Sequence, residues 1–285
     1  KNKRTYYMAE FATIPKSIPA RNSIEYKQKI PKIIWQTINT NRVPVYMKSF
    51  ADSWINLNPE YEYRFHDDDD IIKFIQTDFP QYIDAYKNLK YGASKADLWR
   101  YLIIYKYGGV YADMDCRCLN SLREWIDPNA DFVTQLGINK DICQWLIISV
   151  ANNPIFLKAA EKTLHNSEKN NSSASYYGFE YNKNKLQISS VASPFHFNHP
   201  VLGLSGPPVL QEAAEELFKA ESTESLFAST QIICVSDVAS CQMNGNVIHD
   251  TRNPEYQKSC KALKLAHYNT RIERIKRKFK KLFKF

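Results

Sequence analysis

Long apolar segments are missing from this sequence. No stretch approaches the roughly 18 uninterrupted apolar residues that a transmembrane helix needs. The first residues, KNKRTYYMAEF, also lack the apolar core of a signal peptide. From these two absences we expect the chain as given to be soluble and unsecreted.

Cysteine is scarce, and its spacing does not match a zinc site. We interpret the cysteines as reduced thiols in a reducing compartment; they are Cys116, Cys118, Cys143, Cys234, Cys241 and Cys260. No internal repeat is visible, which argues against a solenoid or other repeat architecture.

Net charge is nearly absent from the body of the chain, although the formal net charge of the whole is +8. The last fifteen residues, RIERIKRKFKKLFKF, hold eight Lys or Arg against one Glu and so supply +7 of that charge. This distribution disfavours a nucleic-acid-binding protein with a basic surface all around. It predicts that the excess positive charge acts at one local site, the C-terminal segment.

The composition is otherwise that of a globular protein. The 285 residues are 44% hydrophobic and 13% aromatic, and that length suits one large α/β domain or two small ones. The surplus of Tyr and Phe indicates a cleft that stacks rings.

The first half of the chain alternates strand and helix patterns. Residues 1–28 show no clear period and are expected to be irregular or helical. Apolar runs then predict strands over 30–37, 61–65 and 110–112 and helices over 49–57, from about residue 71, and over 93–107. The acidic run 67–70 is expected to cap the second helix, and Gly108-Gly109 to end the third. Such alternation predicts a parallel α/β sheet, in which ligands bind beyond the carboxyl ends of the strands.

The second half gives weaker signals. Strands are predicted over 132–134 and 231–235, a buried segment over 145–150, and helices over 153–164 and 207–220. The polar Asn/Ser stretch 168–175 is expected to be a mobile loop.

The predicted strand 110–112 delivers two carboxylates, Asp113 and Asp115, at its carboxyl end. Two aspartates separated by one residue lie within reach of one divalent ion. Oxygen ligands with open positions suit Mg²⁺ or Mn²⁺, which bind through one or two carboxylates plus substrate phosphates. Such an ion would stabilise a diphosphate as a glycosidic bond breaks. Taken alone, the same pattern also fits an acidic surface turn.

Asp97 and Arg100 lie three residues apart and therefore on one face of the preceding helix. They form a structural ion pair, or Asp97 accepts from ribose or sugar hydroxyls while Arg100 donates to sugar or phosphate.

Two longer stretches carry a resemblance to a known family. The residues 95–102, KADLWRYL, and 107–115, YGGVYADMD, resemble the DXD-containing sugar-binding glycosyltransferases of family 32. This family includes yeast initiating α-1,6-mannosyltransferases, animal α-1,4-galactosyltransferases and bacterial capsule enzymes, with glucosylating clostridial toxins as distant relatives. IPKIIWQT at 30–37 and NPEYEY at 58–63 resemble its first two motifs, so the likeness is specific over residues 30–120.

The resemblance implies an α/β GT-A fold, a metal-bound nucleotide-sugar donor and retention of anomeric configuration. If the family's roles are carried over residue by residue, Asp113 and Asp115 would hold Mn²⁺ or Mg²⁺ and the diphosphate, and Asp97 and Arg100 would hold ribose and sugar. These four are the candidate catalytic residues. No carboxylate is identified as a nucleophile.

Further donor contacts follow from the resemblance. Trp35 would stack on the nucleobase, with Gln36 and Thr37 beside it, or Trp35 is simply a core residue. Gln144 falls in a faint match to an asparagine-rich family segment near the donor sugar.

Two later signals are left open. Ser205-Gly206-Pro207-Pro208 resembles a turn that borders the acceptor cleft, and it also fits a plain helix entry. Near the C-terminus, His267 is the candidate third metal ligand and His249 the reserve; a surface His is the alternative.

The tail pattern completes the expected organisation. Residues 1–28 form an N-terminal segment, 29–120 the nucleotide-sugar half, 121–268 the acceptor half, and 269–285 a basic tail. Apolar residues at three and four spacings with Lys and Arg between them are typical of a helix on an anionic membrane surface. A solvated tail is the alternative.

Together these features predict a hexosyl or N-acetylhexosaminyl transferase that uses a UDP- or GDP-sugar. We expect a saccharide acceptor, in particular a lipid-linked bacterial surface polysaccharide, a location on the inner face of the cytoplasmic membrane, and no nucleic-acid partner. A toxin-like transferase that modifies proteins and an inactive carbohydrate-binding module are the alternatives.

Overall fold

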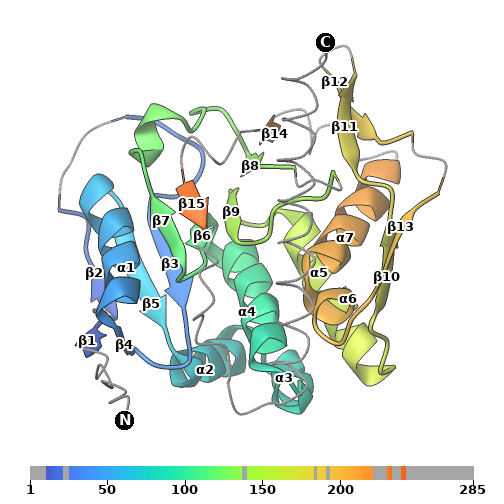
Figure 1. Cartoon of the computed structure of the whole chain (residues 1–285), viewed down its shortest axis with the longest axis horizontal. Coiled ribbons are helices and arrows are strands. Elements are labelled where there is room, and N and C mark those ends of the chain that lie inside the picture. The colour runs from blue at the N-terminus through green and yellow to red at the C-terminus, as the bar shows by residue number, and fades with distance from the viewer. Residues whose placement is uncertain are drawn as a thin grey trace, which may run out of the picture. The chain divides into compact units, whose positions relative to one another are not determined.

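A computed structural model (Figure 1) describes residues 11–21, 26–136, 140–182, 185–190, 193–220, 230–232 and 239–241. All of them belong to one compact unit, residues 1–242. The basic tail, His249 and His267 lie outside the described residues. No helix of the described part is long and apolar enough to cross a membrane.

A mixed sheet of seven strands forms the centre of this unit and confirms the predicted α/β class. Its order is β14 (Thr230–Ile232), β8 (Phe132–Thr134), β9 (Leu146–Ser149), β6 (Gly109–Ala112), β3 (Ile33–Thr37), β5 (Glu62–His66) and β2 (Ser17–Ile18). β3 runs parallel to both β5 and β6, and β8 is parallel to β14.

The expectation of a parallel sheet is wrong at two strands. β9 is antiparallel to β6 and to β8, and β2 is antiparallel to β5. The connection from β8 to β9 is short, and its described residues, 135–136 and 140–145, contain no helix. Such a short connection returns antiparallel because a parallel crossover needs a longer path.

Helices cover both faces of the sheet because successive side chains of each strand point to opposite sides. Ile34 and Val110 pack on α1 (Val45–Leu57), whereas their neighbours Trp35 and Tyr111 pack in the other core. That second core is built with α2 (Asp68–Asp78), α3 (Ile83–Asn88), α4 (Gly92–Tyr107), α5 (Pro154–Glu168) and α7 (Pro207–Lys219).

The predicted central helix is confirmed as α4, whose middle is buried on every side. Gly108 follows its last residue with φ of +64°, a conformation that glycine adopts without strain. A Cβ at this position would lie 2.6 Å from the backbone nitrogen of Ala151, so glycine is also required by space. The chain therefore turns at once from α4 into β6.

Other boundaries differ from the sequence predictions. α1 begins at Val45 rather than residue 49, and α2 begins at Asp68, since Asp67 caps it by accepting from the Asp70 amide at 3.1 Å. Part of the segment expected to be irregular or helical forms β1 (Phe11–Thr13) and β2; β1 pairs with β4 (Arg42–Pro44).

The polar stretch 168–175 is only partly a loop. β10 (Ser173–Tyr176) begins within it and pairs with β13 (Phe195–Asn198), because Ala174 and Tyr176 alternate inward. Two further ribbons join β11 (Phe179–Asn182) to β12 (Lys185–Ile188) and β7 (Cys116–Cys118) to β15 (Ala239–Cys241). Cys116, Cys118 and Cys143 are buried and form no disulfide with one another, while the reducing compartment stays a prediction.

Candidate active site

The candidate site begins where β3, β5 and β6 end at one edge of the sheet. After β3 the chain turns to β5 on one side, and after β5 it crosses to β6 on the other, so β3 and β6 flank a switch point. Open α/β sheets bind ligands at such points. Gln36 spans the two strands by donating to the Asp113 carbonyl at 3.3 Å, while its own oxygen accepts from Tyr63 at 2.9 Å.

The turn Asp113-Met114-Asp115, called the DXD turn from here on, follows β6 directly. Two backbone hydrogen bonds fix its conformation. The Asp113 amide donates to the Trp145 carbonyl at 2.9 Å, and the Cys116 amide donates to the Asp113 carbonyl at 3.0 Å. Met114 is 5% exposed and anchors the turn, so the flanking carboxylates of Asp113 and Asp115 are left half-buried at the surface.

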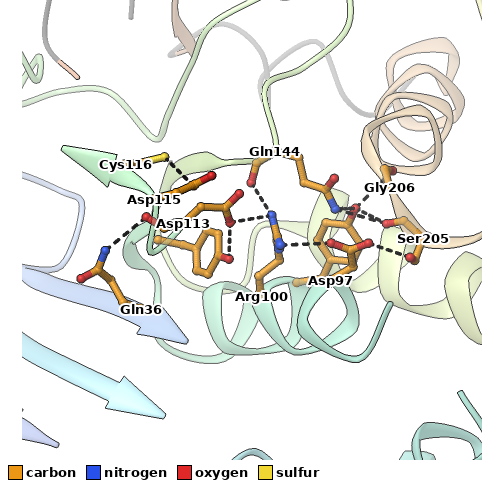
Figure 2. Close-up of polar contacts among 11 residues, drawn as sticks. Gln36, Asp97, Arg100, Asp113, Asp115, Cys116, Gln144, Ser205 and Gly206 are labelled. Carbon is orange, nitrogen blue, oxygen red and sulfur yellow. Dashed lines mark hydrogen bonds and ion pairs between the residues drawn. The ribbon is translucent and has the colours of Figure 1, made fainter. Parts of the chain in front are cut away.

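Arg100 lies between the DXD turn and Asp97 (Figure 2). Its guanidinium pairs with Asp113 at 3.2 Å and with Asp97 at 3.1 Å, and it donates to the Gln144 carbonyl at 3.0 Å. It also lies 4.6 Å from the ring centroid of Tyr111, whose hydroxyl donates to Asp113 at 2.5 Å. Burial alone lowers the pKa of Arg100, but Asp113, Tyr111 and Asp97 outweigh it and raise the pKa, so Arg100 stays cationic.

Asp97 is 5% exposed, and both of its oxygens are engaged. One oxygen pairs with Arg100, and the other accepts from the Ser205 hydroxyl at 2.6 Å. Burial raises the pKa of Asp97 to about 6, although Arg100 and Ser205 both oppose the rise. The carboxyl is therefore mostly ionised at pH 7 and becomes neutral just below it.

Gln144 connects this ion pair to the corner between α6 (Leu202–Ser205) and α7. Its side chain donates to the Tyr101 hydroxyl at 2.6 Å and to the Ser205 carbonyl at 3.2 Å. Tyr101 in turn donates to the same carbonyl at 2.7 Å. The Ser205-Gly206 turn is thus a helix entry that also hydrogen-bonds to the candidate site residues Asp97 and Gln144.

Among the remaining predicted donor residues, the structure places Trp35 in the core, the alternative that the sequence left open. Trp35 is 1% exposed, its indole nitrogen donates to the Gly108 carbonyl at 2.9 Å, and its ring stacks on Tyr107. The Thr37 hydroxyl likewise donates a hydrogen bond to the His66 carbonyl at 2.7 Å. These two side chains therefore hydrogen-bond to the backbone at the edge of the sheet.

The donor set fits a hard divalent ion. Asp113 and Asp115 offer carboxylate oxygens at a half-open surface, which suits Mg²⁺ or Mn²⁺ completed by water and phosphate. Within the described ranges no group of three His, Cys, Asp or Glu could hold a metal, so a third ligand of these four types would come from outside them.

The comparison with known proteins agrees with this geometry. Residues 44–132 match the family described as "Glycosyltransferase sugar-binding region containing DXD motif". This part of the chain is similar to that sugar-binding region. This match supports the family-level resemblance noted in the sequence, and the mixed α/β sheet, with its DXD turn after a central strand, is consistent with a GT-A fold.

Curated relatives extend the match. The chain is 35% identical over 144 residues to a mannosyl phosphorylinositol ceramide synthase of Saccharomyces cerevisiae, covering 48% of this chain and 36% of that protein. It is 29% identical over 209 residues to inositol phosphoceramide mannosyltransferase 2 of Schizosaccharomyces pombe, covering 70% and 55%. The chain thus spans about half of these relatives or less.

Among solved structures, the ligand-free glycosyltransferase domain from the YGT toxin superposes with a TM-score of 0.49 at 10% identity, over 75% of this chain and 81% of that one.

Two members of the site, Tyr101 and Tyr111, were missed in the sequence, and so was the contact between Ser205 and Asp97. Tyr101 and Tyr111 lie inside the quoted motifs of the sugar-binding region, but nothing in the motif letters indicates that their hydroxyls reach Ser205 and Asp113. Ser205 is 108 positions from Asp97, so no local pattern could join the two.

Ser205→Ala is expected to move the acid limb of the pH–rate profile upward. The hydroxyl stabilises the ionised form of Asp97, so its loss raises the pKa of Asp97 further above about 6. Donor hydrolysis measured from pH 5 to 8 checks this, with thermal unfolding as the control for folding. An unmoved or lowered midpoint would contradict the assigned contact.

Proposed function

We propose that the chain is a metal-dependent, retaining glycosyltransferase that moves a hexosyl group from a nucleoside-diphosphate sugar to a lipid-anchored acceptor. The observation that carries this proposal is the Arg100 bridge. One buried guanidinium contacts a carboxylate of the DXD turn and also Asp97, so the expected diphosphate and sugar contacts form one electrostatic unit.

The roles of the side chains follow from their charge and exposure. Asp113 and Asp115 would hold Mn²⁺ or Mg²⁺, with His267 as a further ligand, and the ion would neutralise charge on the departing diphosphate. Arg100 keeps its positive charge beside that position and orients Asp113. Asp97, whose oxygens pair with Arg100 and accept from Ser205, would hold Arg100 in place beside the sugar and diphosphate, and Gln144 would fix the Ser205 turn next to it.

Mannose is the first donor sugar to test because both curated relatives are named for mannosyl transfer. Their names also specify an inositol phosphoceramide product or substrate, a lipid with a polar head. We extend this to a lipid-anchored acceptor here, either an inositol phospholipid or a bacterial lipid-linked saccharide. The basic tail, residues 269–285, would bring the chain to the inner face of the cytoplasmic membrane.

The test is hydrolysis of GDP-mannose, UDP-glucose, UDP-galactose and their N-acetyl forms by the purified chain, with Mn²⁺ or with EDTA. Metal-dependent turnover of one donor, followed by transfer to a lipid-anchored saccharide with retained anomeric configuration, supports the proposal. Transfer only to a purified protein would favour a toxin-like enzyme. No turnover and no nucleotide-dependent thermal shift would leave a carbohydrate-binding module.

A further inference from the structure

Exposed apolar side chains gather where α1 begins. Phe11 is 51% exposed, and Val45 and Tyr46 are each 46% exposed. Phe11 pairs with Pro44 across the β1–β4 ribbon, which places it beside Val45, the first residue of α1. Figure 1 shows β1 and β4 side by side at this end of the helix. Large apolar groups that adjoin one another on a surface mark an interaction site more often than isolated ones do.

Two arginines border these side chains. The guanidinium of Arg42 lies 5.3 Å from the ring centroid of Phe11. That of Arg117 lies 5.0 Å from the ring of Phe50, which meets the ring of Tyr46 edge-on at 6.1 Å. Neither arginine has a salt bridge to a carboxylate in the part of the chain that the structure describes, and residues 38–51 contain no Asp or Glu. The surface therefore combines aromatic rings with uncompensated positive charge.

We propose that Phe11, Val45 and Tyr46, with Arg42 and Arg117, form a docking surface for an anionic lipid bilayer. We call these five residues the Phe11–Tyr46 patch. Tyr and Phe bury their rings at the level of the lipid headgroups, and each Arg near an anionic leaflet adds attraction to phosphate. A second copy of this chain fits less well, because a two-fold contact would bring two positively charged patches together.

The patch is fastened to the strand that follows the DXD turn. Arg117 belongs to β7, and its guanidinium donates to the Ser49 hydroxyl of α1 at 3.1 Å. Trp54 of α1 donates to the Cys116 carbonyl at 2.8 Å, and the Cys118 amide donates to Ser53 at 2.9 Å. These hydrogen bonds join the patch, through α1 and β7, to the turn that carries Asp113 and Asp115. A bilayer bound at the patch would therefore lie at a fixed position relative to these two carboxylates. This use of the patch rests on the proposed lipid-anchored acceptor, whereas vesicle binding itself does not.

The first test is co-sedimentation of the full chain with vesicles of phosphatidylcholine alone or with phosphatidylglycerol. The triple variant Phe11→Ser, Val45→Ser, Tyr46→Ser removes the apolar part of the patch and should weaken binding to the anionic vesicles by at least about tenfold. The matched control is Leu57→Ser with Leu119→Ser, two residues that are 37% and 41% exposed elsewhere on the chain. This control should bind within about twofold of the original chain.

A second measurement separates the patch from the basic tail, which stays in place throughout. A photo-crosslinking phenylalanine analogue at position 46 should attach to lipid in anionic vesicles, and the same analogue at position 119 should not. Unchanged vesicle binding by the triple variant together with equal crosslinking at both positions would overturn the proposal.

Donor hydrolysis in solution distinguishes this proposal from the enzymatic one. The triple variant should hydrolyse soluble donor at the rate of the original chain and lose transfer only to acceptor embedded in vesicles. A chain that binds vesicles through position 46 but hydrolyses no donor would refute the enzymatic proposal and leave the docking surface intact.

Discussion

Asp115→Asn is expected to lower metal-dependent donor turnover by about 10²–10³-fold. The substitution keeps the size of the side chain and removes the charge that would hold the divalent ion against the diphosphate. Asp115 lies half-buried at the surface, so we expect little change in the unfolding temperature. The loss should then appear in turnover and not in folding.

The measurement is initial-rate hydrolysis of the donor identified in the panel, at saturating Mn²⁺ and in EDTA. A second readout is the thermal shift produced by Mn²⁺ with the nucleoside diphosphate, which should disappear in the variant. Asp84→Asn is the matched control, because Asp84 is an exposed carboxylate on α3. Turnover that stays within a few-fold of the original chain, with an intact Mn²⁺ shift, would remove Asp115 from the metal site.

The sequence predicted best the parts of this site that are set by neighbouring residues. The period of α4 placed Asp97 and Arg100 on one face, and the Gly108-Gly109 pair located the start of β6 and hence the DXD turn. These are effects of helix geometry and glycine sterics, which act over a few residues.

Contacts between distant segments were beyond the sequence. The sequence around Trp35 fitted a ring that stacks on a nucleobase and a ring in the core equally well. Only the contacts of the indole with Tyr107 and Gly108 decided between the two. The direction of β9 was likewise hidden, because whether two strands run parallel or antiparallel depends on the connection between them. The Ser205 contact to Asp97 belongs to the same class.

The largest effect on stability is expected at Arg100. Arg100→Met removes the positive charge that two carboxylates share, and Asp97 then remains buried without its cation. Breaking a buried pair by removing one partner typically costs about 3–5 kcal/mol. Lys106→Met is the control on the same helix, since Lys106 pairs with Asp78 at 3.2 Å with its side chain 44% exposed. A surface pair of this kind contributes about 0–1 kcal/mol.

The cost at Arg100 should depend on pH in a defined direction. The pKa of Asp97 is about 6 in the folded chain, above the value of about 3.9 in an unfolded chain. The folded state therefore favours the neutral carboxyl, and the stability that this group contributes is lost as pH rises through about 6. Without Arg100 the pKa of Asp97 rises further, so the carboxylate is penalised more strongly at high pH.

Urea unfolding at pH 5 and pH 8 measures both effects. The free-energy difference between Arg100→Met and the original chain should be larger at pH 8 than at pH 5, and adding Asp97→Asn should recover part of the loss at pH 8. Equal losses at the two pH values, or no recovery in the double variant, would show that Arg100 stabilises the fold by packing alone. The bridge between Asp97 and Asp113 would then have no electrostatic role in holding the sugar-binding region together.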